Sequence, residues 1–90
     1  MSGAERGGAR EEDRAANAIL ALLATRRAGA SICPSEAARR LAPDDWRPLM
    51  PLIRRVAAGL AAERRIEVTQ KGVVVAPETA KGAIRLRLPS

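Results

Sequence analysis

One stretch, residues 46–65 (WRPLMPLIRRVAAGLAAERR), has the longest regular hydrophobic period in the chain. Its apolar residues recur at steps of three and four, which places them along one side of an α-helix. They are Trp46, Leu49, Met50, Ile53, Val56, Ala57 and Leu60. The other side carries Arg47, Arg54, Arg55, Ala58, Ala62 and Arg65. The stretch therefore predicts a long helix that packs through its apolar side and shows a cationic side to solvent.

Two prolines, Pro48 and Pro51, lie within this stretch. A proline is tolerated in the first turn of a helix, because its missing N–H has no intrahelical acceptor there. Pro48 fits that position. Pro51 is compatible either with a kink in one continuous helix or with a short turn over residues 45–50 before a helix that starts near Pro51. We favour the kinked continuous helix, and we expect Asp44 or Asp45 to cap it.

Two shorter helices are predicted ahead of the long one. Residues 11–27 have apolar side chains at helical spacing, with acidic residues at the start and arginines at the end, as the helix dipole favours. The apolar side consists of Ala16, Ile19, Leu20, Leu22 and Leu23. Pro34 suits the first position of a helix that runs to Leu41, with Cys33 as N-cap and Glu36 placed to bond back to it. Arg39 and Arg40 then point outward.

After residue 65 the hydrophobic period changes from 3.6 to 2. Residues 66–70 and 73–75 flank Lys71-Gly72, which is the pattern of a β-hairpin. Residues 77–82 indicate a turn, or one helical turn. Residues 84–88 then alternate apolar side chains with Arg85 and Arg87, as in a half-buried strand with two cations on its open face. Residues 30–33, before Pro34, indicate one more short strand.

This order of elements (helix, short strand, helix, tight turn, longer helix, hairpin) is that of a winged helix-turn-helix domain. The expected class is α+β, mainly α, with three helices and a small antiparallel β-wing. A chain of 90 residues allows one domain with a small core. We place that domain at residues 11–90 and expect residues 1–10, which are Gly-rich and of mixed charge, to be disordered.

Four separated segments carry a resemblance to a known family: residues 31–36 (SICPSE), 46–50 (WRPLM), 66–72 (IEVTQKG) and 82–86 (GAIRL). With these segments in this order, the sequence resembles a family of short bacterial proteins of unknown function. The resemblance implies a winged-helix-like fold and no established activity. In the family pattern a glycine is common between the long helix and the hairpin, where this chain has Arg64-Arg65. Either an arginine adopts the left-handed conformation there, at some cost, or the chain leaves the helix differently.

The charge of the chain is unevenly spread. The whole sequence has a formal net charge of +6, and from Arg14 onward 14 Lys and Arg stand against 6 Asp and Glu, a net of +8. Such an excess attracts polyanions, so nucleic acid is the first partner class to consider. The competing interpretation is that the arginines, with the many alanines, reflect the base composition of the genome and form ordinary solvated surface.

The predicted function is nucleic-acid binding, with duplex DNA as the partner, through the cationic third helix and the hairpin wing. Arginines on an exposed helix contact phosphates or the O6 and N7 atoms of guanine. Lys71 at the hairpin tip is expected to contact a neighbouring phosphate or the minor groove. Arg39 and Arg40 are expected to clamp the DNA backbone. The candidate residues are Arg39, Arg40, Arg47, Arg54, Arg55 and Lys71.

The alternative function is a protein-docking module of the same fold, because a fold does not fix a function. Its surface would be the edge of the hairpin at residues 73–75 or the strand at residues 84–88, and its partner another protein or a second copy in a homodimer.

Other function classes are disfavoured. The sequence has no histidine to activate its one cysteine, Cys33, or to bind a metal, so we expect no enzyme activity, no cofactor and no metal site. No apolar run is long enough to span a membrane, and residues 1–10 do not form a signal peptide, which predicts a cytoplasmic protein.

Overall fold

The computed structural model describes residues 6–77 and 79–89 of the chain. These residues contain three helices and four short strands. The helices are α1 (Arg6–Ala24), α2 (Pro34–Leu41) and α3 (Met50–Ala62), and a 3₁₀ turn, η2 (Arg47–Leu49), directly precedes α3. The strands are β1 (Ser31–Ile32), β2 (Glu67–Gln70), β3 (Val73–Val74) and β4 (Arg85–Arg87). This arrangement confirms the α+β class, mainly α, with three helices and a small antiparallel sheet, and it is compatible with a winged helix.

The strands form one antiparallel sheet in the order β1-β4-β2-β3. Strand β4 lies in the middle, with Leu86 opposite Ile32 of β1 on one side and Val68 of β2 on the other. Strand β3 pairs with the outer edge of β2 and is itself an edge strand.

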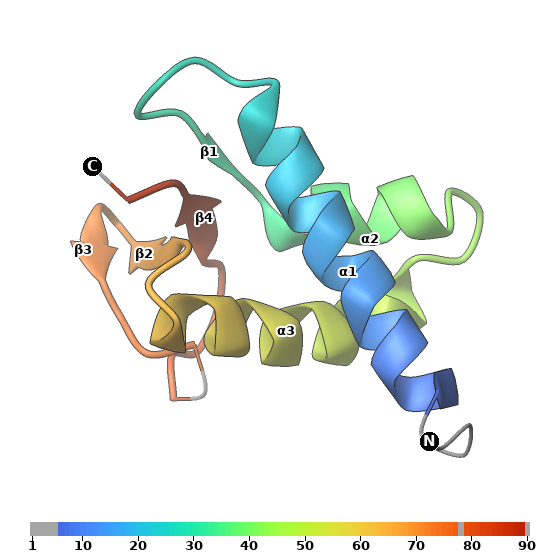
Figure 1. Cartoon of the computed structure of the whole chain (residues 1–90). Helices are drawn as coiled ribbons and strands as arrows, with labels where there is room; N and C mark the ends of the chain where they lie inside the picture. The colour runs from blue at the N-terminus through green and yellow to red at the C-terminus, as the bar shows by residue number, and fades with distance from the viewer. Residues whose placement is uncertain (1–5, 78, 90) are drawn as a thin grey trace.

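The core lies between the helices and one face of this sheet. Figure 1 shows α1 lying across α3, with the sheet at the C-terminal end of α3. Every helix and three of the four strands contribute side chains that are almost fully buried, among them Ile19, Leu23, Ala37, Ala38, Ile53, Leu60, Ile32, Val68 and Leu86. Burying one valine, leucine or isoleucine side chain stabilises a fold by about 1.5–3 kcal/mol. The predicted apolar side of the third helix therefore packs as expected.

Helix α1 differs from the prediction at both ends. It begins at Arg6, within the segment expected to be disordered, and residues 1–5 lie outside the described part. Once a helix has formed, each further residue adds one hydrogen bond, so the packed segment extends toward the N-terminus. The helix ends at Ala24, because the N–H and hydroxyl of Thr25 both donate to the carbonyl oxygen of Leu22, at 3.1 and 2.7 Å. The acidic residues 11–13 are thus not in its first turn, and the dipole argument does not apply to them.

Helix α2 confirms its prediction in detail. Cys33 is the N-cap, Pro34 follows it, and the carboxylate of Glu36 accepts a hydrogen bond from the Cys33 N–H at 2.9 Å. Ala37 and Ala38 are buried, and Arg39 and Arg40 are exposed.

The start of α3 shows that the kinked continuous helix was the wrong choice. Pro48 lies in η2, and Pro51 lies in the first turn of α3, where the N–H it lacks would have no intrahelical acceptor. The Leu49 N–H bonds to the carbonyl oxygen of Trp46 at 2.9 Å, which closes the separate turn. Because this turn intervenes, neither Asp44 nor Asp45 caps α3: the N-cap is Leu49, without a side-chain cap bond.

The exit from α3 uses a left-handed arginine. Arg64 has a φ of 62°, the conformation that glycine favours at this position. The N–H of Arg65 donates to the carbonyl oxygen of Leu60 at 2.9 Å. The N–H of Arg64 donates to the carbonyl oxygen of Ala61, also at 2.9 Å. These two bonds form a Schellman motif, which satisfies helix carbonyl groups that would otherwise lack donors.

Replacing Arg64 with glycine is expected to stabilise the domain by about 0.5–1 kcal/mol. The left-handed conformation costs a non-glycine residue about 1–2 kcal/mol, which exceeds the about 0.5–1 kcal/mol that glycine adds through its freer unfolded state. Urea unfolding measures the difference. Arg65→Gly is the control, because φ of Arg65 is not positive and its substitution should destabilise. Equal shifts in the same direction would contradict this explanation.

The hairpin forms as predicted. Lys71 and Gly72 have φ values of 53° and 82°, so both central residues are left-handed, as a type I′ turn requires. Leu86 of β4 and Ile84, directly before this strand, are buried in the core, but Leu88 is 42% exposed, because the strand ends at Arg87.

Candidate nucleic-acid interface

The six predicted contact residues lie in three different environments. Three surround the junction between α2 and η2, one lies at the hairpin tip, and two make bonds to other parts of the chain. We call Arg39, Arg40 and Arg47 the junction cluster. It lies near the N-terminal end of α3, whereas the hairpin with Lys71 follows its C-terminal end (Figure 1).

Trp46 holds two of the three arginines of the junction cluster. The guanidinium carbons of Arg39 and Arg47 each lie 4.6 Å from the centroid of its ring. Each such cation–π contact contributes about 0.5–1 kcal/mol at an exposed site. The indole is half-buried against the core, so it holds the two exposed guanidinium groups in place. Sequence reasoning assigned Trp46 to the core and missed this second role, although Arg47 directly follows it.

The positive charges of the junction cluster form no salt bridge with a carboxylate of the described residues. Within the described residues, the four salt bridges join Arg26, Arg55, Arg65 and Arg87 to glutamates. No arginine of the junction cluster takes part in one. Asp44 and Asp45 lie in the same connection and reduce the local charge without cancelling it.

Arg54, predicted on the open cationic side of the helix, instead holds a distant loop. Its guanidinium donates to the carbonyl oxygens of Ala80 at 2.9 Å and Gly82 at 3.4 Å. The side-chain amide of Gln70 donates to the intervening and following carbonyls, those of Lys81 at 2.5 Å and Ala83 at 3.2 Å. Arg54 and Gln70 thus bind four consecutive carbonyl groups and fix the segment before β4 beside α3.

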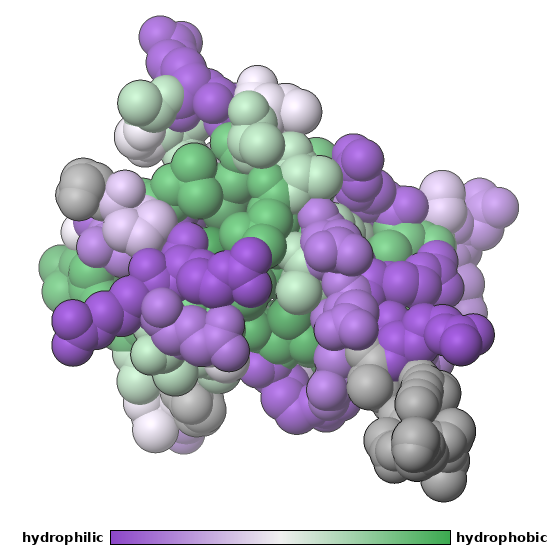
Figure 2. Space-filling model, viewed as in Figure 1, coloured by the Kyte–Doolittle hydropathy of each residue, from purple (hydrophilic) through white to green (hydrophobic). Residues whose placement is uncertain are grey.

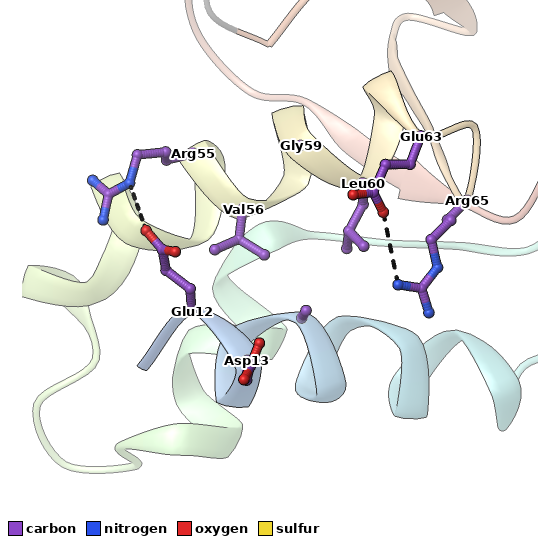
Figure 3. Close-up of a pocket in the computed structure, with 9 residues that line it drawn as sticks. Glu12, Asp13, Arg55, Val56, Gly59, Leu60, Glu63 and Arg65 are labelled. Atoms are coloured by element: carbon purple, nitrogen blue, oxygen red, sulfur yellow. Dashed lines mark ion pairs between the residues drawn. The ribbon is translucent and has the colours of Figure 1, made fainter. Parts of the chain in front are cut away.

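Arg55 points away from Arg54 and toward α1. Figure 3 shows its guanidinium directed at the carboxylate of Glu12, with 3.6 Å between Nε and Oε2. The two residues form one end of a groove between α1 and α3, and Glu63 and Arg65, 3.8 Å apart, form the other end. An exposed ion pair contributes little stability, but it places a negative charge beside Arg55. The groove therefore has no single sign of charge.

Lys71 is exposed at the hairpin tip, as predicted. Helix α3 has 13 residues and is therefore about 20 Å long, which separates the junction cluster from the hairpin.

The cations expected on the open face of β4 are also engaged. Arg85 donates to the hydroxyl and carbonyl oxygens of Ser31, at 2.9 and 3.0 Å, and Arg87 pairs with Glu67 at 2.8 Å. These contacts join β4 to both of its neighbours.

Comparison with known protein families identifies the family of the chain. Residues 12–89 match the model of DUF3253, described as a protein of unknown function. The chain belongs to this family. No curated protein matches the sequence of this DUF3253 member. Neither its family nor its fold indicates an activity, so its function has to be inferred from its surface residues.

The two predicted docking surfaces of the DUF3253 protein have different outcomes. Strand β3 is an edge strand, and its Val73 and Val74 are 66% and 57% exposed. Figure 2 shows hydrophobic surface over β3, at the left edge of the molecule. The other surface, residues 84–88, was predicted wrongly, because β4 pairs on both sides and offers no open edge to a partner.

Two further findings concern the described residues of this DUF3253 protein. None of its helices in residues 6–77 and 79–89 combines the length and the apolar character that crossing a membrane requires. Across the same residues, no three His, Cys, Asp or Glu side chains are grouped in a way that could hold a metal ion.

Proposed function

We propose that this DUF3253 protein binds duplex nucleic acid in the cytoplasm, as a non-enzymatic domain, through the junction cluster and Lys71. The observation that carries the proposal is the pair of exposed guanidinium groups stacked on Trp46, in a cluster without salt bridges to described carboxylates. A guanidinium forms two parallel hydrogen bonds to a phosphate, and stacking on an aromatic ring reduces the conformational freedom that it loses on binding.

The placement of the cations supports the same partner. A major groove about 12 Å wide accommodates one α-helix, with phosphates along both of its sides. The junction cluster precedes α3 and Lys71 follows it. With α3 directed at the groove, cations at its two ends are suited to phosphates on the two sides. Contacts of this kind fix the register of a protein on the duplex.

A titration with salt as the variable tests the proposal. Each neutralised phosphate contributes about 0.9 to the slope of log K against log salt, so four cations predict a slope of about −3 to −4. Fluorescence anisotropy with a labelled random duplex, at several salt concentrations between about 50 and 200 mM, measures it. A dissociation constant weaker than about 1 mM at the lowest salt would contradict the proposal, because non-specific binding typically lies between about 10⁻⁴ and 10⁻⁶ M.

The alternative function, docking of an extended protein segment or a second copy, is favoured by the exposed valines of the edge strand β3. Such a contact would depend on apolar burial and main-chain hydrogen bonds and would change little with salt. If the domain shows no salt-dependent binding of duplex, β3 becomes the leading candidate interface.

A further inference from the structure

The exposed side of α3 decides whether the proposed interface could recognise a base sequence. In helix-turn-helix proteins this side of the recognition helix meets the edges of the bases, and sequence is recognised by side chains that donate or accept hydrogen bonds there. At about 100° per residue, Arg54 and Arg55 are separated by only about 100° around the helix. Pro51, Ala58 and Ala62 lie between them, and Gly59 lies about 40° beyond Arg55.

Both arginines are directed at other parts of the chain. Arg54 is bonded to the carbonyl oxygens of Ala80 and Gly82, so its donors are occupied by the loop beside α3. Arg55 is directed at Glu12 on α1 (Figure 3). Removing Arg54 from the loop would leave carbonyl groups without their donor, which opposes its reorientation toward a base.

The four other residues of this side have no polar side-chain atom. They contribute only small apolar groups and backbone, because their side chains are those of alanine, glycine and proline. A β-carbon added at Gly59 would meet nothing within 4 Å, so packing inside the described chain does not demand the absence of a side chain there. A surface of this kind lets a helix approach a groove closely and offers the base edges no hydrogen-bond partners.

From these observations we infer that the domain binds duplex nucleic acid through its phosphates alone and does not discriminate between base sequences. The inference rests on the proposed function and deepens it, because it assigns the class of ligand: a duplex of any sequence. It also replaces the expectation that Arg54 and Arg55 contact guanine. The groups proposed to contact phosphate belong to the junction cluster before α3 and to the hairpin after it, and none of them lies on the exposed side of the helix.

The test compares duplexes of equal length and unrelated sequence. Three labelled 20-base-pair duplexes, one A·T-rich, one G·C-rich and one mixed, are titrated at the same salt concentration. We expect their dissociation constants to agree within about threefold, because a protein that recognises bases loses roughly fivefold or more for each mismatched pair. Selection from a random pool is the second measurement, and we expect it to enrich no common motif.

Arg55→Ala is the matched variant, because Arg55 is exposed and we expect its replacement to change stability little. We expect it to change the affinity for all three duplexes by the same small factor, about twofold or less. An enriched motif, or a preference of more than about tenfold that disappears in this variant, would overturn the inference while leaving nucleic-acid binding in place. Failure to bind any of the duplexes would overturn the proposed function itself, and the two results are distinguished by whether the mixed duplex is bound.

Discussion

Replacing Ile53 with alanine is expected to destabilise the domain by about 3–4 kcal/mol. Ile53 is fully buried on the apolar side of α3, within the hydrophobic core. The substitution removes apolar contacts and leaves a cavity that the surrounding side chains fill only in part. A domain of this size has a total stability of about 5–10 kcal/mol, so the variant should lose a large share of it.

Urea unfolding followed by circular dichroism measures the loss, with two control variants. Ile53→Val removes one methylene group and should cost about 0.5–1.5 kcal/mol. Leu52→Ala removes a side chain of the same size from the neighbouring position, which is only half-buried, and should cost less than Ile53→Ala. Similar losses for Leu52→Ala and Ile53→Ala would show that the buried side of α3 is wrongly assigned.

Replacing the four proposed phosphate contacts together, Arg39, Arg40, Arg47 and Lys71, with alanine is expected to abolish measurable duplex binding. Neutralising four phosphates corresponds to a change in affinity on the order of a hundredfold between about 50 and 200 mM salt. The variant should lose at least that much affinity at the lower salt concentration. The slope against salt should fall toward zero. Anisotropy with the labelled random duplex measures both quantities.

A second variant with the same loss of charge separates a binding site from a general effect of net charge. Arg10, Arg27, Arg65 and Lys81 are exposed and lie outside the proposed interface. Their replacement with alanine should weaken binding only modestly, because unlocalised charge acts at long range and is screened by salt. Melting temperatures of both variants are compared, since loss of the stack on Trp46 costs about 1–2 kcal/mol. Equal losses of affinity would show that the junction cluster is no more than solvated surface.

The features that sequence patterns predicted correctly depend on local rules. Helix α2 follows from Pro34 at its first position and Glu36 within reach of the Cys33 N–H, all inside four residues. The type I′ turn follows from the two residues between two β-patterned segments. Both outcomes are set by backbone conformation and nearest neighbours, which a single sequence displays directly.

The features that sequence patterns did not predict depend on contacts with residues far away in the chain, or on a choice between two conformations of similar energy. The bonds of Arg54 to the loop join residues separated by 26 and 28 positions, and helical periodicity shows only that the arginine lies outside the apolar side. Pro51 fits the first turn of a helix as well as a kink, and the closing of the turn at Trp46 decides between them. The same limit applies to the site: Arg39 and Trp46 come from different elements, and only packing brings them together.

The central position of β4 sets the order in which the domain can assemble during synthesis. The helices form hydrogen bonds between residues close in the sequence. Strand β1 can pair only after β4 has been synthesised, because Ser31 pairs with Arg87 of β4, far along the chain. Until residues 85–87 have left the ribosome, β1 and β2 each lack the neighbour that lies between them. Contacts of such large sequence separation slow folding because a long loop must close first. The sheet is therefore completed after the helices, and a nascent chain that stalls before β4 exposes two unpaired strand edges to other proteins.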